Sequence, residues 1–370
     1  MTPDLGPGLA GRLPDFPWDT LDSFKHRAAA HPHGVVDLSV GTPVDPVPEV
    51  VQRALSLAAN APGYPTTVGT SELRGAAVRW MQRRLGASVD EHAVLPLIGS
   101  KEFVAWLPTL LGLSAQSTVV IPELAYPTYE VGARVVGAEV VATDSTLSLG
   151  PSRPQLLWLN SPSNPSGRVL PAPHLKKVVD WARERDCLVV SDECYIELGW
   201  DQHPVSVLHP DVCGGTHHGV LAVHSLSKRS NLAGYRAAFV CGDTAAIELL
   251  TRARKHLGML MPSPVQAAMV AALDDDEHVV LQRERYLGRR SLLREALMTA
   301  GFRIDSSQAG LYLWATRDED SWASVEWFAD RGILVAPGAF YGVAGHRHVR
   351  VALTASDIAI EQAAQRLTAG

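Results

Sequence analysis

The segment His224-Ser-Leu-Ser-Lys-Arg-Ser-Asn-Leu-Ala-Gly-Tyr-Arg236 follows a run of apolar residues, Gly219-Val-Leu-Ala-Val. A short apolar run of this kind predicts a buried β-strand. A single lysine, Lys228, comes just after the strand, in a turn rich in hydroxyl groups. An uncharged lysine amine can form a Schiff base with a carbonyl group. The segment therefore indicates either a reactive lysine or a surface turn with a solvated lysine.

Three other residues of the segment favour a reactive lysine beside a phosphate group. Ser225 and Ser227 supply hydroxyl donors, and Arg236 supplies a guanidinium group; these are groups that bind phosphate. Pyridoxal 5'-phosphate (PLP) carries both an aldehyde and a phosphate. PLP is therefore the cofactor that the segment suggests, and the rest of the chain must supply its other contacts.

The chain around this segment alternates strand-like and helix-like runs. The predicted strands are Ala93–Ile98, Thr118–Ile121, Glu139–Ala142, Gln155–Leu159, Leu188–Ser191, Gly219–His224 and Ala237–Cys241. The helical runs between them are Glu102–Leu113, Tyr129–Val136 and Pro173–Arg185. Several strands are continuous apolar runs, as in a sheet covered on both faces. The pattern predicts an α/β fold with a mostly parallel seven-stranded sheet flanked by helices, and ligands at the carboxyl ends of its strands.

The length of 370 residues favours two domains over one core. We expect residues 1–45 to form an N-terminal arm and part of a small domain, because this region is rich in proline and glycine. Residues 46–255 would form the large cofactor-binding domain. Residues 256–370 mix helical patterns with short strands, which predicts a smaller α+β domain.

The composition is that of an ordinary soluble globular protein, with 46% hydrophobic and 19% charged residues. A net charge of −6 gives no sign of nucleic-acid or membrane binding. No apolar run approaches the roughly 20 residues that span a bilayer, and the N-terminus lacks a signal-peptide pattern. The four cysteines have no paired spacing. We therefore expect a cytoplasmic location.

Polar residues that follow the predicted strands are the next candidates for the site. Gly99, Ser100 and Lys101 follow the strand that ends at Ile98, and they open a helix. The free N–H groups and positive dipole end of a helix suit a phosphate. Glycine and serine are also common helix caps, so both interpretations remain open for these three residues.

A carboxylate, Asp192, follows the strand Leu188–Ser191. A carboxylate at the end of a buried strand is costly unless it is paired. A protonated pyridine nitrogen would pair it and would strengthen the ring as an electron sink. Tyr195, three residues later, is placed to reach the hydroxyl group of the same ring. The alternative is magnesium bound by Asp192 and Glu193, but no Walker sequence accompanies them.

Three further residues have two interpretations each. Asn164 lies in the polar loop after another strand, where it would bond a ligand oxygen or initiate a turn. Tyr126 follows a third strand and would stack on a flat cofactor or join the core. Arg350 lies in an apolar strand and needs an anionic partner. That partner would be a substrate carboxylate or a structural salt bridge.

One loop is rich in histidine and invites a zinc interpretation. Its residues are His203, His209, Cys213, His217 and His218. Their spacing matches no standard zinc-ligand pattern. We therefore expect a solvated loop and no metal.

Together and in this order, these motifs resemble the fold-type I PLP-dependent aminotransferases, in the branch that contains aspartate aminotransferase. The resemblance covers nearly the whole chain. Its most specific parts are Asn164-Pro-Ser-Gly167, Asp192-Glu-Cys-Tyr195, and Ser225-Leu-Ser-Lys228 with Arg236 eight residues after the lysine. The resemblance implies PLP as the cofactor and small amino and keto acids as substrates.

The resemblance also implies a role for each residue that matches a family motif. Lys228 would bond the cofactor aldehyde and move the proton, and Asp192 would pair with the pyridine nitrogen. Asn164 and Tyr195 would bond the ring hydroxyl, and Tyr126 would stack on the ring. The residues implied to hold the phosphate are Gly99, Ser100, Lys101, Ser225, Ser227 and Arg236.

The implied substrate contacts come from both ends of the chain. Arg350 would bind the substrate α-carboxylate, with Gly41 and Asn164 lining that part of the site. Tyr64 matches the family's tyrosine that crosses to the phosphate of the neighbouring subunit. This match implies a homodimer with shared active sites.

Two features bear on the substrate. The chain has no clear match for the second arginine with which aspartate aminotransferase binds a side-chain carboxylate, so aspartate specificity is not implied. The segments around Gly99 and Ser225 are similar to those of actinobacterial succinyldiaminopimelate aminotransferases of lysine biosynthesis. This similarity implies ping-pong amino transfer between glutamate and N-succinyl-2-amino-6-oxopimelate.

Other functions remain open at this stage. An aminotransferase for aspartate, alanine or LL-diaminopimelate, or a PLP-dependent lyase, would share every site residue named above. A non-catalytic sensor domain would not need both Lys228 and Asp192. A nucleotide-dependent α/β enzyme is disfavoured because the chain lacks both G-x-G-x-x-G and a P-loop.

Overall fold

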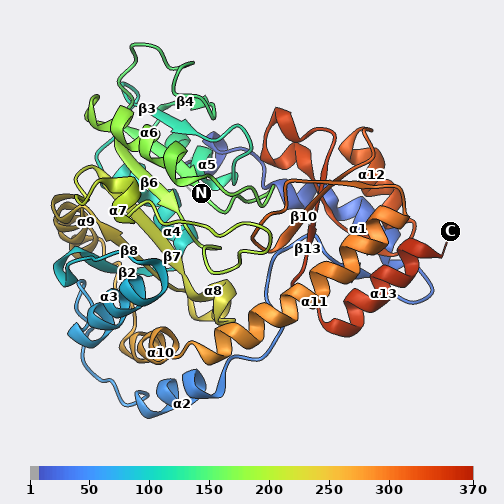
Figure 1. Ribbon diagram of the computed structural model, residues 1–370, viewed down its shortest axis with the longest axis horizontal. Helices are drawn as coiled ribbons and strands as arrows, with labels where there is room; N and C mark the ends of the chain where they lie inside the picture. Colours follow the sequence, from blue (N-terminus) through green and yellow to red (C-terminus); the bar gives the residue numbers. More distant parts are fainter. Residues whose placement is uncertain (1–7, 370) are drawn as a thin grey trace, which may run out of the picture.

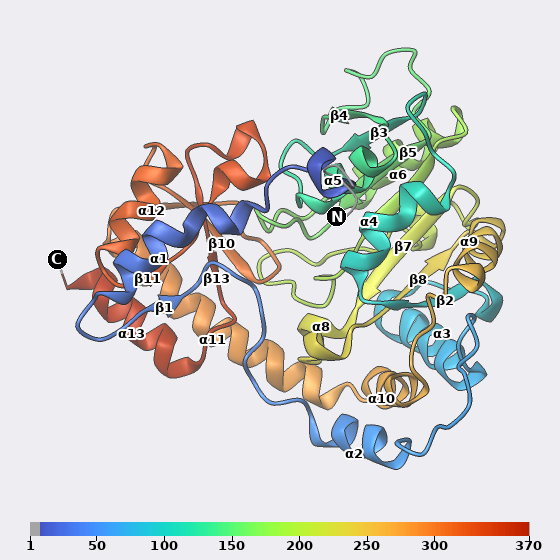
Figure 2. The ribbon, with the colours of Figure 1, turned by 180° about the vertical axis from the view of Figure 1, so that it is seen from behind.

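The computed structural model describes residues 8–369 and shows two lobes (Figures 1 and 2). One lobe contains the large sheet and the helices around it. The other contains the C-terminal elements together with the N-terminal helix α1 (Asp22–Ala29). The long helix α11 (Glu277–Thr299) runs from the first lobe along the second. Each lobe has its own hydrophobic core, and that of the large lobe covers both faces of its sheet.

The large sheet has seven strands in the order β2-β8-β7-β6-β5-β3-β4. Its strands are β2 (Val94–Ile98), β3 (Thr118–Ile121), β4 (Glu139–Ala142), β5 (Leu156–Asn160), β6 (Leu188–Asp192), β7 (Val220–Ser225) and β8 (Ala237–Gly242). All pairs are parallel except those of β8, which is antiparallel to β2 and β7. The predicted fold class and all seven predicted strands are confirmed.

Helices cover both faces of this sheet. On one face the core receives side chains from α3 (Ser71–Leu85), α6 (Ala172–Arg183) and α10 (Ser263–Asp274). On the other face it receives them from α4 (Ser100–Leu110), α5 (Thr128–Val135) and α9 (Thr244–His256). Successive residues of a strand point to opposite faces, which is why the strands are apolar throughout. Two short helices, α2 (Glu49–Leu57) and α7 (Pro210–Cys213), complete the lobe.

The second lobe has a four-stranded antiparallel sheet in the order β12-β13-β10-β9. Its strands are β9 (Arg303–Asp305), β10 (Tyr312–Thr316), β12 (Ala336–Pro337) and β13 (Val349–Ala352). The helices α11, α12 (Ser321–Ala329) and α13 (Asp357–Thr368) pack around it. A separate parallel pair joins β1 (Val36–Asp37) to β11 (Ile333–Leu334). The strand β1, like α1, therefore belongs to the same lobe as the C-terminal elements.

The division of the chain into domains stays a proposal. Helix α10 packs against α2 and α3, and its Met269 and Leu273 lie in the core of the large sheet. This packing favours a boundary near residue 276, at the start of α11, over one near residue 255. The boundary near residue 255 is the one expected from the sequence, in which the helical pattern of α10 does not reveal which sheet the helix covers.

Two further properties concern the chain as a whole. Within residues 8–369, no helix combines the length and the apolar character needed to cross a membrane. All four cysteines have free thiols, and Cys187, Cys213 and Cys241 are buried. Burial raises the pKa of the Cys187 thiol to about 12, which is typical of an inert core thiol.

Candidate active site

Three neighbouring strands, β5, β6 and β7, end at the same edge of the large sheet. Asn160 lies opposite Asp192 in the register, and Asp192 lies opposite Val223. Because side chains alternate along a strand, Asn160, Asp192 and Ser225 all point to the face covered by α4 and α5. Strand β7 continues directly into α8 (Leu226–Arg229). The segment with Lys228, which the sequence predicts as a turn, is thus a single helical turn. Ser225 caps this turn, because its hydroxyl accepts a hydrogen bond from the Ser227 N–H group at 3.2 Å.

The side chain of Lys228 lies inside the site. Its ammonium Nζ donates a hydrogen bond to the carbonyl oxygen of Gly41. No acidic side chain of residues 8–369 forms an ion pair with it. Burial lowers the pKa of Lys228 below its ordinary value, and the nearby Tyr312 and Cys194 raise it in part. The environment therefore shifts the amine towards its uncharged, nucleophilic form.

Asp192 is a buried carboxylate that has hydrogen-bond donors but no cationic partner among residues 8–369. Its Oδ2 accepts a hydrogen bond from the Tyr129 hydroxyl at 2.9 Å, and its Oδ1 accepts one from the Cys194 N–H group at 3.2 Å. Burial raises its pKa, and these hydrogen bonds oppose the rise. A buried carboxylate without a charged partner is unfavourable in the protein alone. A cationic group at this position would therefore be stabilised.

The magnesium alternative for Asp192 and Glu193 has no support in the geometry. The Glu193 side chain accepts a hydrogen bond from the Val207 N–H group at 2.7 Å, on the opposite side of the strand from Asp192. Within the described part of the chain, no group of three or more His, Cys, Asp or Glu side chains is arranged to hold a metal ion. In the histidine-rich loop, His209 caps α7, and Cys213 is buried in the core.

The loop after β5 is tied to the strand by Asn160. Its side-chain Nδ2 donates to the carbonyl oxygen of Asp192 at 2.9 Å, and its Oδ1 accepts from the Asn164 N–H group at 2.7 Å. These bonds fix Asn164 at the edge of the site. Asn164 Oδ1 in turn accepts a hydrogen bond from Arg350 at 2.9 Å. The remaining Nδ2 group of Asn164 is the one free to donate to a ligand oxygen.

Arg350 on β13 is a buried cation without an acidic partner. It is 3% exposed. Its guanidinium donates to Asn164 and, at 2.6 Å, to the carbonyl oxygen of Ser39. Its Nε has no hydrogen-bond partner within residues 8–369, and no carboxylate of these residues lies within ion-pair distance. The structural salt bridge considered from the sequence is therefore absent from the described residues.

Aromatic rings surround the Arg350 guanidinium instead of carboxylates. The distances from its Cζ to the ring centroids are 4.0 Å for Tyr312, 5.0 Å for Tyr341 and 5.8 Å for Trp18. Such rings stabilise a cation without neutralising it. The arrangement leaves the guanidinium free to take up a carboxylate.

A third group of residues forms a cradle for an anion. Gly99 begins α4 with φ of +80°, a conformation that favours glycine. A Cβ placed on Gly99 would overlap the guanidinium of Arg236, so only glycine allows this close approach. The α4 N–H groups, beginning at Ser100, and the Ser225 and Ser227 hydroxyls belong to the same edge of the sheet. Burial and the charge of Arg236 both lower the pKa of Lys101, so an anion here would relieve the repulsion between these cations.

The remaining predicted residues fall into two groups. Tyr126 lies near the site, with its ring edge-on to Tyr129 at 5.9 Å and below the Lys101 amine at the same distance. The Tyr195 hydroxyl lies 3.1 Å from that of Tyr312. Tyr64, in contrast, is 99% exposed, and no contact links it to the site of its own chain within the described residues. Its predicted role across a subunit boundary stays a prediction.

Sequence reasoning missed four aromatic residues of the site: Trp18, Tyr129, Tyr312 and Tyr341. Tyr129 is one helical turn after Tyr126, and that spacing is a usable signal. Tyr312 lies in an apolar strand, where an aromatic residue resembles ordinary core. Trp18 reaches the site from the N-terminal arm, which the sequence pattern does not locate.

The residues present fit PLP by their chemistry. The site offers a deprotonatable lysine, a carboxylate that lacks a cation and an anion cradle at a helix N-terminus, all at one sheet edge. An aldehyde, a pyridinium nitrogen and a phosphate are their respective complements. None of these three groups of the cofactor pairs with the guanidinium of Arg350. Since it has no carboxylate partner among residues 8–369, it suits a carboxylate on the substrate.

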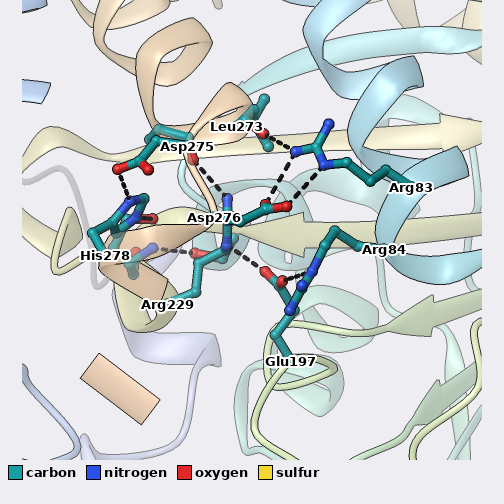
Figure 3. Close-up of polar contacts among 12 residues, drawn as sticks. Arg83, Arg84, Glu197, Arg229, Leu273, Asp275, Asp276 and His278 are labelled. Carbon is teal, nitrogen blue, oxygen red and sulfur yellow. Dashed lines mark hydrogen bonds and ion pairs between the residues drawn. The ribbon is translucent and has the colours of Figure 1, made fainter. Parts of the chain in front are cut away.

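The Arg229 side chain, next to Lys228, has an opposite environment. Its guanidinium pairs with Glu197 and donates to the carbonyl oxygen of Ala272 at 3.2 Å. Glu197 also pairs with Arg84 at 2.9 Å, and the charges of Asp276 and Glu197 both favour the Arg229 cation (Figure 3). This cluster fastens α8, and with it Lys228, to α3 and α10.

Comparisons with known proteins agree with this chemistry. The family model described as aminotransferase class I and II matches residues 33–367. A probable aminotransferase of Mycobacterium tuberculosis is 62% identical, over 98% of this chain and 87% of that protein. The 4-dedimethylamino-4-oxo-anhydrotetracycline transaminase of Streptomyces rimosus is 58% identical, over 96% of this chain and 99% of that protein. The solved structure of a probable N-succinyldiaminopimelate aminotransferase of Thermus thermophilus is 28% identical with a TM-score of 0.85, over 96% of this chain and 100% of that chain.

Proposed function

The chain belongs to the class I and II aminotransferases, which use PLP, and we propose that it transfers an amino group between glutamate and N-succinyl-2-amino-6-oxopimelate. This reaction would serve lysine biosynthesis through diaminopimelate. The observation that carries the amino-acid part of the proposal is the free guanidinium of Arg350 in its aromatic cage. When bound, PLP supplies an aldehyde that takes up the amino group and a ring that delocalises charge from the substrate carbon.

In the proposed mechanism, Lys228 has two tasks. Its Nζ would hold the cofactor through the aldehyde group, and the uncharged amine would serve as the base that moves the α-proton of the substrate. Burial supports both tasks because it lowers the pKa of the amine. The two half-reactions, with glutamate and then with the keto acid, give ping-pong kinetics.

The other residues hold the cofactor and the substrate in place. Asp192 would pair with the pyridine nitrogen and favour its protonated form, since this buried carboxylate has two neutral donors and no cationic partner among residues 8–369. Tyr195 and Asn164 donate to the ring oxygen. Arg350 binds the α-carboxylate through two parallel hydrogen bonds, and this fixes which bond to the α-carbon faces Lys228.

The proposed cofactor cradle and ring contact complete the set. The phosphate would be held by Gly99, Ser100, Lys101, Ser225, Ser227 and Arg236, and Tyr126 would stack on the ring.

A direct test of the assignment of Lys228 is the visible absorption of purified protein with added PLP. We expect Lys228→Ala to lose the band of the lysine-bound cofactor, while Asp192→Asn keeps the band with weaker cofactor binding. A band unchanged in Lys228→Ala would reject the assignment of this lysine.

Two observations support a dicarboxylic substrate longer than aspartate. The solved structure from Thermus thermophilus is named for the succinylated diaminopimelate reaction. In this chain, the Lys101 amine lies 5.3 Å from the Phe16 ring and 5.9 Å from the Tyr126 ring. It forms no ion pair with the acidic residues of the described chain. With the phosphate held through the backbone N–H group of Lys101, its amine is a second cation, in addition to Arg350, that has no counter-ion among the described residues. Such a cation suits a second carboxylate at the far end of a long substrate.

A polycyclic ketone is the second candidate for the amino acceptor. The reason is the 58% identity to the Streptomyces rimosus transaminase, whose name specifies an anhydrotetracycline ketone. The neighbouring aromatic rings of Phe16, Trp18 and Phe340 would suit such a molecule. An acceptor panel with glutamate as donor separates the candidates. It contains the succinylated keto acid, oxaloacetate, pyruvate and an aromatic polycyclic ketone, and the highest kcat/KM identifies the class.

A related test separates amino transfer from elimination on the same fold. A PLP-dependent lyase would release ammonia and pyruvate from its amino acid without any acceptor. We expect no ammonia release from glutamate or the succinylated amino acid in the absence of a keto acid. Ammonia formed at the rate of substrate loss would favour the lyase.

We also propose a cytoplasmic homodimer with shared active sites. Tyr64 is almost fully exposed in one chain, and Leu57, Val44 and Val68 near it are exposed apolar residues. Exposed apolar side chains close in sequence are typical of a subunit contact. The free thiols fit a reducing compartment. Light scattering gives the molar mass, and Tyr64→Phe is expected to weaken PLP binding, because the hydroxyl would reach the phosphate of the partner.

A further inference from the structure

Tyr312 lies at the point where the proposed cofactor and substrate contacts meet. It begins β10 and is buried, at 4% exposure. In the antiparallel register, Trp314 lies opposite Arg350. Tyr312 is two residues from Trp314, so it points to the same face as Arg350 and is its diagonal neighbour. The β10–β13 pairing therefore places the ring beneath the guanidinium.

The Tyr312 hydroxyl has a different set of neighbours from the ring. It lies 3.1 Å from the Tyr195 hydroxyl, and the two ring centroids are 5.8 Å apart at 72°. It also packs against Gly41, where a Cβ would overlap it. The Gly41 carbonyl oxygen accepts the hydrogen bond from Lys228. The hydroxyl therefore touches the residues that surround the reacting amine.

The geometry points to Tyr312 as a positioning residue of the transamination site: its hydroxyl holds and polarises Tyr195, and its ring supports Arg350. This inference rests on the proposed roles of Tyr195, Lys228 and Arg350. Nothing in the motifs of the chain assigns Tyr312 a function. One side chain would thus link the contact to the cofactor with the contact to the substrate carboxylate.

The direction of the hydrogen bond follows from the proposed role of Tyr195. If the Tyr195 hydroxyl donates its single proton to the cofactor ring oxygen, then its own oxygen is the acceptor for the Tyr312 O–H group. Donation from Tyr312 makes Tyr195 a stronger donor, because hydrogen bonds in a chain polarise one another. A stronger donor favours the deprotonated ring oxygen. The two functions of Tyr312 therefore have separate readouts.

The test uses two variants of the PLP-loaded enzyme. Tyr312→Phe removes the hydroxyl and keeps the ring under Arg350. We expect the pH midpoint of its visible absorption change to rise by about 0.5–1 unit, kcat to fall several-fold and the KM for glutamate to change less than about twofold. Tyr312→Leu also removes the ring, and we expect a further increase of roughly fivefold or more in that KM.

Controls separate this role from general effects on folding. Tyr286→Phe removes another buried tyrosine hydroxyl of the same lobe, which donates to Asn231 at 3.4 Å and has no hydrogen bond to Tyr195; we expect it to leave the absorption midpoint unchanged. In Tyr195→Phe, adding Tyr312→Phe should cause no further shift of the midpoint. A full additional shift would show that the two hydroxyls act independently, and it would overturn the inference.

The outcomes distinguish this inference from the proposed function. If Lys228→Ala loses its absorption band while Tyr312→Phe behaves like the wild-type enzyme, the proposed function stands and the role of Tyr312 is rejected. If Tyr312→Phe and Tyr312→Leu have the same KM for glutamate, support of Arg350 by the ring is rejected. Tyr312→Phe is almost isosteric, so it remains informative even if Tyr312→Leu does not fold.

Discussion

Arg229 and Arg350 are both almost completely buried, at 5% and 3% exposure, yet their surroundings differ. Arg229 pairs with the buried carboxylate of Glu197 and belongs to a network that joins α3, α8 and α10 (Figure 3). Arg350 has carbonyl and amide acceptors and three aromatic rings, but no carboxylate within residues 8–369. Burial alone therefore does not identify a binding residue. The missing counter-ion identifies the binding residue, because a buried cation without a counter-ion is stabilised when an anionic ligand binds.

The largest expected effect comes from removing the unpaired cation. Arg350→Met keeps the volume of the side chain but cannot bind a carboxylate. We expect kcat/KM for the amino acid to fall by about 10³-fold, in line with the loss of a bidentate charged contact, with little change in PLP affinity. Steady-state kinetics and a PLP titration measure the two quantities. Equal losses in both would remove the distinction between the two arginines.

The opposite result is expected for the paired cation. Arg229→Met leaves the buried Glu197 with Arg84 as its one remaining partner among residues 8–369, and breaking a buried pair costs about 3 kcal/mol or more. We expect a clear loss in the free energy of unfolding and a fall in activity that follows PLP retention. Denaturant unfolding measures the free energy of unfolding of Arg229→Met and of Arg350→Met, and the two values are compared. If Arg350→Met were the less stable of the two, the interpretation of Arg229 as the structural arginine would be wrong.

A smaller effect tests whether Arg229 and Glu197 act as a pair. In Arg229→Met combined with Glu197→Leu, no buried charge of the pair is left without its partner. Since replacing both members of a buried ion pair is often nearly neutral, we expect the double variant to recover about 1–2 kcal/mol relative to Arg229→Met. A double variant that loses the sum of both single effects would show that the two charges do not interact.

The smallest effect concerns the titratable neighbours of Arg229. Burial, and then the charge of Arg229, lower the pKa of His224 to about 3. Burial raises the pKa of Glu193 to about 7. For His224, whose folded pKa lies below that of the unfolded chain, stability is present above about pH 6.5 and is lost as the pH falls towards 3. For Glu193, whose folded pKa lies above that of the unfolded chain, stability is present below about pH 4.5 and is lost as the pH rises towards 7.

The contributions of His224 and Glu193 to the free energy of unfolding change in opposite directions between about pH 4.5 and 6.5. Variants that lack one of the two groups are therefore needed to measure each contribution. We expect Glu193→Gln to lose stability as the pH falls through this window, by about 1 kcal/mol per pH unit more than the wild-type protein does. His224→Phe should show the opposite slope. The measurement is denaturant unfolding at several pH values. Parallel curves for all three proteins would show that neither group changes its pKa on folding.

Much of the fold was predictable from the sequence, for a clear physical reason. Strands such as Leu188–Asp192 are covered on both faces, and a continuous apolar run records that directly. The one-turn helix that carries Lys228 was missed because four residues are too few to show a helical period. The sheet that α10 covers was not predictable, because the pattern of a helix records burial but not the partner that buries it.

The candidate site was predictable to the extent that each residue follows a strand. Lys228, Asp192 and Asn164 do so, and the parallel register brings their strands together. Arg350 was ambiguous, because the sequence does not show whether an acidic residue lies nearby, and the structure answers that for the described residues. Tyr312 was not predictable, since its function depends on contacts with Tyr195 and Gly41, far away in the chain.

The pairing of β1 with β11 has a consequence for the synthesis of the protein. Val36 and Asp37 lie opposite Ile333 and Leu334 in the parallel register, so β1 leaves the ribosome almost 300 residues before its partner strand. The seven strands of the large sheet have all been made once residue 242 has emerged. The large sheet can therefore form on the ribosome while the N-terminal segment is still without its partner strand β11. Gly41, which accepts the hydrogen bond from Lys228, follows β1 closely in the chain. A nascent chain therefore has its lysine in place well before the site around that lysine is closed, and the last strands to be translated complete it.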